Sequence, residues 1–269
     1  MEKYTLGFIG TGNMGGALAL AASKGIASGS LIISDKDEGK AMAMAKELNC
    51  AYSHNEELAS NSKYIFLGVK PQYLEGLLWE IAPVLKSRTD RFILVSMAAG
   101  VKTDRILSIL DADYPVIRIM PNTPCRVGEG MILYHPTKAV THEETEEFKS
   151  LMSNAGKFDE LPESLIDAGC AISGCGPAFA YMFIDALADG GVAAGLTKAQ
   201  AVKYAAQTLL GSAKMVLGSG DSPADLKDAV CSPGGSTIAG VKALEEGALR
   251  ATAMNAVESA LKRTKELGK

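Results

Sequence analysis

The sequence predicts an α/β protein in which a doubly wound parallel sheet is followed by an all-α segment. Over about the first 160 residues, short apolar runs alternate with helix-like stretches, a pattern typical of βαβ units. The apolar runs show no period-two alternation, as expected when helices cover both faces of a sheet. Beyond residue 162 every stretch has helical character. We therefore expect two domains, residues 1–161 and 162–269.

The expected elements of the first domain follow from apolar runs and from helix-like stretches between them. The expected strands cover residues 5–9, 31–34, 64–69, 92–96 and 115–120. The expected helices cover residues 17–27, 38–48, 73–85 and 103–110. Thr141 and Glu144 have the spacing of a capping box, which opens a helix that we expect to stop near Gly156.

Helix-start signals organise the second domain. Pro177 opens one expected helix, Thr197 with Gln200 caps another, and Ser222 precedes a proline at the first position of a third. The ranges expected for the first, second, fourth and fifth helices are 177–190, 197–217, 237–246 and 248–267. We expect this domain to contain helices and no strands.

The composition is that of a soluble globular protein, with 47% hydrophobic and 22% charged residues among 269. The formal net charge is -4 and no long basic run occurs, so a nucleic-acid partner is not expected. Residues 170–188 form a weakly polar stretch that contains Pro177 and Asp185. We expect a packed helix pair there and no membrane span.

The cysteines and histidines argue against disulfides and against a metal site. Five cysteines occur, an odd number with no CxxC pair, which suits a reducing compartment and a cytoplasmic protein. Three histidines occur, and none has ligand spacing from a cysteine or from another histidine. We therefore expect no metal ion.

A glycine motif stands between the first expected strand and the first expected helix, at Gly10-Thr11-Gly12-Asn13-Met14-Gly15. GxGxxG in this context is the signature of a Rossmann dinucleotide site. The first glycine permits a tight turn, the second allows the backbone to approach a pyrophosphate, and the third allows helix and strand to pack closely. We expect all six residues to bind the cofactor.

Asp35 follows the second strand, about 20 residues beyond the motif, where a carboxylate binds a ribose 2′-hydroxyl. Lys36 is beside it and would attract a 2′-phosphate instead. The sequence therefore predicts NAD or NADP, in reduced form as a hydride donor, without choosing between them.

Other strand ends are also expected to line the cofactor site, because ligands of open α/β sheets lie at the carboxyl ends of the strands. The expected contacts are Val69-Lys70-Pro71, Ala98-Ala99-Gly100 and Asn122, with Asn55 as a further cofactor-binding residue. Small residues there leave room for a flat ring. Lys70 is equally well explained as a solvated lysine at a strand end that does not contact the cofactor.

A second group of small and hydroxyl residues, Cys231-Ser232-Pro233-Gly234-Gly235-Ser236-Thr237, precedes a helix-like run. Backbone N–H groups at a helix start have no intrahelical partner and bind small anions, here a carboxylate. Taken alone, the segment also fits an ordinary interhelical turn with Thr237 as the N-cap. With the glycine motif, it suggests a nucleotide at one site and a small acid at the other.

These residues closely resemble the pyrroline-5-carboxylate reductase family over essentially the whole chain. The resemblance is carried by Phe8-Ile9-Gly10-x-Gly12-Asn13-Met14, Val69-Lys70-Pro71, Ala98-Ala99-Gly100-Val101, Met120-Pro121-Asn122-Thr123-Pro124, Ser173-Gly174-x-Gly176-Pro177-Ala178 and Leu226-Lys227-Asp228-x-Val230-x-Ser232-Pro233-Gly234-Gly235-x-Thr237-Ile238. The last of these segments is the most specific.

The resemblance implies a Rossmann domain followed by a helical domain that interlocks with a partner subunit, in dimers that often assemble into decamers. It implies reduction of 1-pyrroline-5-carboxylate to L-proline by hydride transfer to the imine carbon. We expect Ser232, Gly234 and Gly235 to bind the substrate carboxylate. We expect Thr237 to bind the substrate ring nitrogen and to act as the catalytic hydroxyl.

Two residues depart from the family pattern, and two other functions stay open. Cys175 stands where the family usually has a small polar residue, and Asp35 where NADPH-preferring members often have a smaller one. One alternative is an oxidoreductase that acts on another imine or on a 3-hydroxy acid. Lys203, Lys214 and Lys227 are available for the hydroxy-acid class but lack its surrounding motif. The other is an NAD(P)-binding redox sensor without turnover.

Overall fold

The computed structural model describes residues 3–267 and consists of two compact units. The first unit holds residues up to 175 together with the end of the chain from residue 260. The second unit holds residues 176–259.

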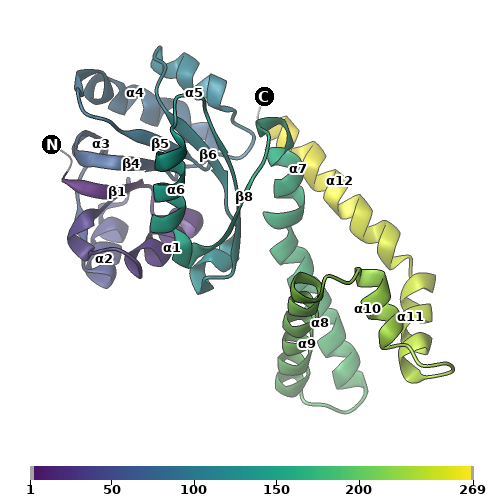
Figure 1. Ribbon diagram of the computed structural model, residues 1–269. Helices are drawn as coiled ribbons and strands as arrows, with labels where there is room; N and C mark the ends of the chain where they lie inside the picture. Colours follow the sequence, from purple (N-terminus) through teal and green to yellow (C-terminus); the bar gives the residue numbers. More distant parts are fainter. Residues whose placement is uncertain (1–2, 268–269) are drawn as a thin grey trace. The chain divides into compact units, whose positions relative to one another are not determined.

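The first unit is built on one sheet of eight strands in the order β3-β2-β1-β4-β5-β6-β7-β8 (Figure 1). The strands are β1 (Tyr4–Ile9), β2 (Leu31–Ser34), β3 (Ala51–Tyr52), β4 (Ser62–Leu67), β5 (Ile93–Ser96), β6 (Val116–Met120), β7 (Gly130–Pro136) and β8 (Gly156–Glu160). Neighbouring strands are parallel except β6 and β7, which are antiparallel. The expected doubly wound, mostly parallel sheet is confirmed.

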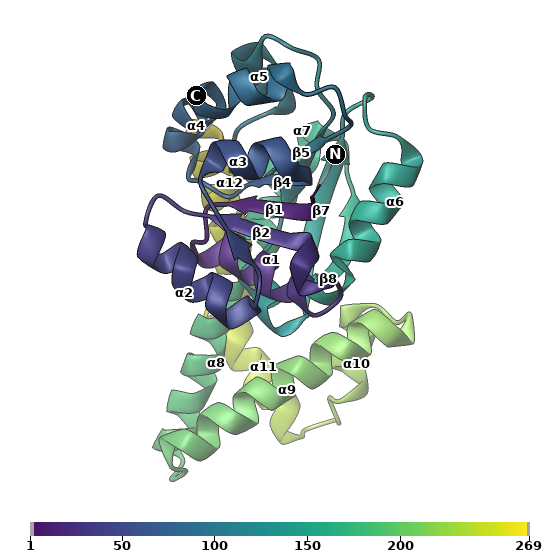
Figure 2. The ribbon, with the colours of Figure 1, turned by 90° about the vertical axis from the view of Figure 1, so that its left-hand side faces the viewer.

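Helices cover both faces of the sheet, as the continuous apolar strands predict. One core contains side chains of α1 (Asn13–Ser23), α2 (Glu38–Leu48) and α6 (His142–Leu151). The opposite core contains side chains of α3 (Asn55–Asn61), α4 (Pro71–Ser87) and α5 (Thr103–Leu110). Figure 2 shows α1 and α2 on one side of the strands and α3 to α5 on the other.

Several expected elements are confirmed and others are corrected. The ranges 31–34, 38–48 and 103–110 match β2, α2 and α5, and the Thr141–Glu144 capping box opens α6. The expected start of the first helix at Ala17 is wrong, since α1 begins at Asn13. The expected end of α6 near Gly156 is also wrong. The helix ends at Leu151, a 3-10 turn η3 (Ser153–Ala155) follows, and Gly156, with φ 140°, opens β8.

Helix α7 (Glu163–Ser173) packs on the sheet of the first unit. Its buried residues Ile166 and Cys170 lie in a cluster with Met120 of β6 and Leu133 of β7. The expected domain boundary at residue 161 falls immediately before α7, whereas the compact units divide after Cys175. Packing therefore joins α7 to the strands that precede it in the sequence.

The second unit is helical, with α8 (Gly176–Ala193), α9 (Lys198–Ser219), α10 (Pro223–Ala229), α11 (Ser236–Glu246) and the larger part of α12 (Leu249–Leu267). Helices α8 and α9 form its closest-packed pair (Figure 1). The expected caps Thr197 and Ser222 are confirmed, since their hydroxyls accept the N–H of Gln200 and Asp225.

By length and composition alone, the segment Glu163–Ala193 is long and apolar enough to cross a membrane. Within its apolar 18-residue stretch, 11% is buried in the protein. Residues 170–188 contain parts of two packed helices, as expected. A turn at Gly174–Cys175 divides the segment, α7 packs on the sheet, and α8 packs on α9 in the other unit.

Little of the second unit is buried within a single chain. Its buried apolar residues are three alanines, Ala188, Ala201 and Ala205, among the residues described. Large apolar side chains are exposed instead, including Tyr181 at 60%, Met182 at 73% and Met215 at 55%. Exposed apolar patches of this kind mark protein–protein contacts.

Candidate functional site

The glycine loop after β1 is packed too closely for side chains at two positions. Gly10 has φ 94°, and a Cβ there would lie 2.7 Å from the carbonyl oxygen of Gly68. A Cβ at Gly15 would collide with the carbonyl oxygen of Gly10. The first and third glycines therefore do what the motif predicts, a tight turn and close packing of helix and strand.

Gly12 is different, because a Cβ there would meet nothing within 4 Å. It is the N-cap of α1, no side chain caps the helix, and no acidic residue lies in its first turn. An uncapped helix start next to open space provides unpaired N–H groups and a favourable dipole for an anion. This part of the chain fits the pyrophosphate of a dinucleotide.

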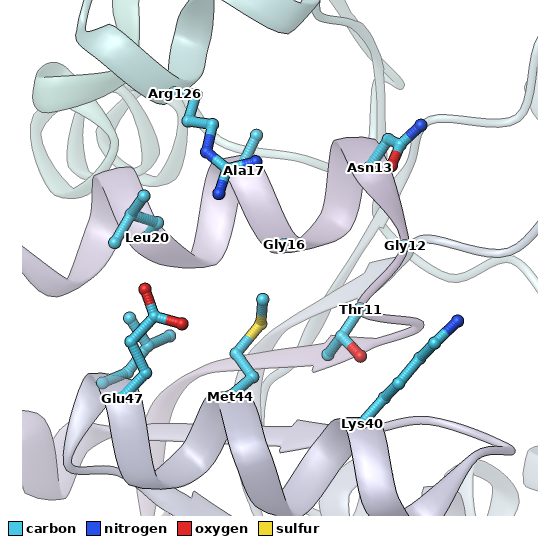
Figure 3. Close-up of a pocket in the computed structure, with 11 residues that line it drawn as sticks. Thr11, Gly12, Asn13, Gly16, Ala17, Leu20, Lys40, Met44, Glu47 and Arg126 are labelled. Carbon is cyan, nitrogen blue, oxygen red and sulfur yellow. The ribbon is translucent and has the colours of Figure 1, made fainter.

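A groove of about 220 Å³ runs from this loop between α1 and α2 (Figure 3). Thr11, Gly12 and Asn13 line one end of it. Lys40 of α2 and Arg126 of the 3-10 turn η2 (Thr123–Val127) also line it. These two cations were not predicted as site residues. Their contribution depends on the packing of α2 and η2 against α1, which no local motif signals.

Asp35 is tied to the glycine loop. Its carboxylate accepts hydrogen bonds from the Thr11 N–H at 2.7 Å, the Thr11 hydroxyl at 2.9 Å and the Asp37 N–H at 3.0 Å. Burial alone would raise the pKa of Asp35. The hydrogen bonds from Asp37 and Thr11, with the nearby charge of Lys40, outweigh that effect and lower the pKa. Asp35 is therefore held as a carboxylate beside the expected cofactor site.

Asp35 also lines a second cavity, with Tyr52, His54 and Glu57 among its other walls. Asn55, at the start of α3, accepts a hydrogen bond from the Ser34 hydroxyl at 2.7 Å and donates to Glu80 at 3.0 Å. The Lys36 ammonium lies 5.0 Å from the centre of the Tyr73 ring. Asn55 and Lys36 are thus brought to the same end of β2 as Asp35.

The other strand ends predicted for the cofactor site belong to the same unit. Lys70 is the exposed N-cap residue of α4, and Pro71 is the first residue of that helix. A Cβ on the neighbouring Gly68 would lie 2.7 Å from the Gly10 carbonyl oxygen, so the segment before Val69 touches the glycine loop. Gly100 has φ 75° and lies inside a tight turn in which the Val101 N–H donates to the Ala98 carbonyl oxygen at 3.3 Å.

Asn122 is 8% exposed and its side chain is used within the protein. The amide donates to the Ser173 carbonyl oxygen at 2.9 Å, and the amide oxygen accepts the Met131 N–H at 2.9 Å. Asn122 therefore ties the end of β6 to β7 and to the last residue of α7. A cofactor contact of Asn122 remains a prediction.

The loop before α11 has the shape that the second predicted anion site needs. Gly234 has φ 68°, the left-handed region that favours glycine, and Gly235 is the N-cap of α11 without any side-chain cap. The alternative reading with Thr237 as the N-cap is wrong. Ser232, Gly234 and Thr237 are exposed. The N–H groups of the first turn of α11 follow directly and lack intrahelical partners.

Gly235 has two further roles in this loop. Its N–H donates to the Ser232 carbonyl oxygen at 3.0 Å, which closes the turn. A Cβ at Gly235 would collide with the Ser232 hydroxyl.

The glycine loop lies in the first unit and the 231–237 loop in the second. Within residues 3–267, no group of three or more His, Cys, Asp and Glu side chains has the geometry of a metal site.

Known proteins share this arrangement over the full length of the chain. Pyrroline-5-carboxylate reductase 3 of Danio rerio is 42% identical over 269 residues, 99% of this chain and 92% of the relative. The chain belongs to the pyrroline-5-carboxylate reductase family. The pyrroline-5-carboxylate reductase of Escherichia coli (strain K12) is 39% identical, with both chains covered completely.

Solved structures and family models agree with this membership. The Plasmodium falciparum pyrroline carboxylate reductase with NADP bound matches with a TM-score of 0.89 and 35% identity over all of both chains. Residues 163–267 match the model for pyrroline-5-carboxylate reductase dimerisation. Residues 5–100 match the model for the coenzyme F420-dependent NADP oxidoreductase. As a pyrroline-5-carboxylate reductase family member, the chain is an NAD(P)H-dependent oxidoreductase.

Proposed function

We propose that this chain catalyses the reduction of 1-pyrroline-5-carboxylate to L-proline, the last step of proline biosynthesis, with NADPH or NADH as the reductant. The observation that carries this proposal is full-length similarity to reductases of that name, including 39% identity to the Escherichia coli enzyme. The two loops described above give the proposal its physical content, because each suits an anionic ligand.

At the cofactor end, the pyrophosphate binds the uncapped start of α1 and the loop formed by Gly10, Thr11, Gly12, Asn13, Met14 and Gly15. Gly12 leaves the space that the pyrophosphate needs. Asp35 and Asn55 face the ribose side. The strand ends Val69-Lys70-Pro71, Ala98-Ala99-Gly100 and Asn122 surround the nicotinamide side, where small residues leave room for a flat ring.

At the substrate end, the carboxylate binds unpaired N–H groups of the loop before α11, with the Ser232 hydroxyl as a further donor. Gly234 and the first turn of α11 provide these N–H groups. Since the Gly235 N–H already closes the turn on Ser232, Gly235 contributes mainly as the N-cap that directs the following N–H groups. A side chain at Gly235 would displace the Ser232 hydroxyl, the further donor.

The bound nicotinamide supplies the hydride that adds to the imine carbon. The protein binds and orients the substrate, and orientation of the reacting groups provides a large share of rate acceleration. The Thr237 hydroxyl lies on the first turn of α11, next to the proposed carboxylate site. We assign to it a hydrogen bond with the ring nitrogen, through which the nitrogen exchanges its proton.

The helical segment supports association of chains. It matches a dimerisation model over residues 163–267 and exposes large apolar side chains such as Met182 and Met215. We propose a homodimer in which the second unit of one chain packs on that of another, and further assembly into decamers. The apolar surface of α8 is then covered by protein instead of lipid, and the enzyme works in the cytoplasm without a membrane.

The alternative functions have less support. A 3-hydroxy-acid reductase would need a positioned lysine, but Lys227 forms an ion pair with Asp228, and no catalytic motif surrounds Lys203 or Lys214. A redox sensor without turnover would have no use for a second anion site.

Steady-state assays distinguish these functions. The loss of nicotinamide absorbance is followed with 1-pyrroline-5-carboxylate and, separately, with a six-membered cyclic imino acid and a 3-oxo acid. Turnover with pyrroline-5-carboxylate, with L-proline as the product, supports the proposal. Turnover with the 3-oxo acid alone, or NADPH binding without any turnover, rejects it.

A further inference from the structure

We infer that Glu163, the first residue of α7, is a positioning residue for the nicotinamide side of the cofactor site. Its carboxylate holds the start of α5 and, with it, the loop that contains Ala98-Ala99-Gly100. This inference rests on the proposed function, because it takes that loop as part of the cofactor site.

The contact between Glu163 and α5 is direct and double. The Thr103 N–H donates to Glu163 Oε1 at 2.7 Å, and the Thr103 hydroxyl donates to Oε2 at 3.2 Å. Thr103 is the first residue of α5, and the N-cap residue Lys102 provides no side-chain cap. A carboxylate at a helix start binds the unpaired N–H groups and is favoured by the helix dipole. Glu163 therefore caps α5 from a distant part of the sequence.

The loop fixed by this cap is short. Only residues 97–102 separate the end of β5 at Ser96 from Thr103. At one end, β5 is held in register with β6, where Ser96 pairs with Arg118. At the other end, Glu163 holds Thr103. Because both ends are fixed, the turn from Ala98 to Gly100 has little freedom to move relative to the sheet.

A buried cation holds Glu163 in this position. Arg118 of β6 is 0% exposed, and its Nη2 donates to Asp167 Oδ1 at 2.6 Å. Its Nη1 lies 3.6 Å from Glu163 Oε1, and Nε and Nη1 form no hydrogen bonds within the described residues. A buried guanidinium requires nearby carboxylates. Asp167 takes the hydrogen bond from Arg118, so Glu163 keeps both oxygens for Thr103 while its charge faces the arginine.

The opposite end of α7 contacts a second strand-end loop. The Ser173 carbonyl oxygen accepts the Asn122 amide at 2.9 Å, next to the end of β6. Helix α7 is therefore attached to the segments that follow β5 and β6, both of which we place beside the nicotinamide. This explains why α7 needs to pack with the sheet, although it belongs to the segment that matches the dimerisation model.

The test compares Glu163→Ala, Glu163→Gln, Thr103→Val and the control Asp104→Asn. Glutamine keeps an oxygen for the Thr103 N–H, while Thr103→Val removes one of the two hydrogen bonds with little change in shape. Asp104→Asn removes an exposed carboxylate from the same first turn of α5, next to Thr103, and leaves Glu163 and Arg118 unchanged. For each variant, kcat and the KM of both substrates are measured. NADPH binding is measured separately by the fluorescence of the bound nicotinamide.

We expect Glu163→Ala to lower kcat about tenfold or more, because small displacements of positioning groups have effects of this size. It should also shift the nicotinamide fluorescence of the complex, while the KM for pyrroline-5-carboxylate changes little. Glu163→Gln should restore most of the rate, and Thr103→Val should fall between them. Asp104→Asn should keep the wild-type kcat and fluorescence.

An unchanged kcat and fluorescence in Glu163→Ala would overturn the inference, as would an equal loss in Asp104→Asn. If Glu163→Ala does not fold, Thr103→Val and Glu163→Gln decide the question by the same criteria. If the wild-type protein binds NADPH but does not reduce pyrroline-5-carboxylate, the proposed function fails. The fluorescence of the variants then decides the role of Glu163 by itself.

Discussion

The Asp35 carboxylate accepts hydrogen bonds from both the backbone N–H and the hydroxyl of Thr11, at 2.7 and 2.9 Å. This pair joins the end of β2 to the loop between the first two glycines of the motif. The loop that we propose to hold the pyrophosphate is thus fixed by a charged group. The same charge lies where the ribose of the cofactor is expected.

Asp35→Ser should shift the preference of the enzyme toward NADPH. A carboxylate near the ribose repels a 2′-phosphate, and a hydroxyl does not. We expect the ratio of kcat/KM for NADPH to that for NADH to rise about tenfold, the effect of about 1.4 kcal/mol. Glu143→Ser, at the exposed start of α6, is the control and should leave the ratio unchanged. An Asp35→Ser enzyme with the wild-type ratio would show that Asp35 does not select the cofactor.

Asp35 should also make the stability of the protein depend on pH. Its pKa in the folded protein is lowered, since hydrogen bonds from Asp37 and Thr11 and the charge of Lys40 outweigh the opposing effect of burial. A carboxyl with a lowered folded pKa contributes stability above its unfolded pKa, about 3.9, and loses it as the pH falls through the folded pKa. Asp35→Asn should therefore destabilise the protein at neutral pH and much less at the acid end. Urea unfolding of both proteins between about pH 3 and pH 7 measures this. A difference that stays constant across this range would contradict the assignment.

Thr237→Ala should lower kcat about a hundredfold, which is the size of effect expected when a proton-transfer partner is removed. The Kd of NADPH should stay nearly unchanged. The reason is the place of Thr237 on the first turn of α11, beside the proposed carboxylate site. Thr237→Ser keeps a hydroxyl and should retain most of the activity. Ser236→Ala, which removes the neighbouring exposed hydroxyl, is the matched control. If Thr237→Ala and Ser236→Ala show the same kcat, Thr237 has no part in the chemistry.

Removing Asp167 should destabilise the first unit strongly. Arg118 is fully buried and Asp167 accepts its one hydrogen bond within the described residues. Loss of one partner of a buried ion pair costs about 3–5 kcal/mol when the other charge is left uncompensated. Glu163 Oε1 lies 3.6 Å from Arg118 Nη1 and keeps part of the compensation, so we expect Asp167→Ala to lower the free energy of unfolding by a smaller amount, about 2–3 kcal/mol.

The double variant Arg118→Met/Asp167→Ala should regain part of this loss, since no buried guanidinium then remains. Urea unfolding at one fixed protein concentration measures both variants. Equal losses in the single and double variants would mean that the cost comes from packing instead of charge.

Met182→Glu should separate the subunits. Met182 is 73% exposed on α8, within the segment that matches the dimerisation model, and a charge buried in an apolar interface is costly. Sedimentation velocity should show a dimer or a larger assembly for the wild type and a shift toward monomer for the variant. Met42→Glu, at a side chain 49% exposed on α2, is the control. An unchanged assembly in Met182→Glu would exclude this face of α8 from the interface.

Much of the fold follows from local sequence signals. Strand β7, which was not expected, carries such a signal in its apolar run GMILYHP, whereas β8, also not expected, does not. The apolar runs of β2 and β5 and the caps of α6 and α9 are readable because each signal lies within one element. Strand β8 has the sequence GKFDE, in which four of five residues are glycine or charged. It is a strand because β7 pairs with it. Such a strand depends on its neighbour, and no local pattern predicts it.

The candidate site shows the same limit. The roles of Gly10 and Gly15 follow from the motif, because only close backbone packing requires those glycines. The link from Glu163 to Thr103 joins residues 60 apart in the sequence. The bonds from the Asn122 side chain to Ser173 and Met131 likewise had no signal in the sequence around Asn122. Partners at such separations are set by tertiary packing and cannot be inferred from either segment alone.

The most direct test of the account is a crystal structure of this protein with oxidised NADP and L-proline, the proposed product. We predict that the proline carboxylate lies about 3 Å from N–H groups of the segment Gly234–Thr237. The proline ring nitrogen should then lie within hydrogen-bond distance of the Thr237 hydroxyl. Proline bound at any other place, with that segment in contact with solvent only, would contradict the account.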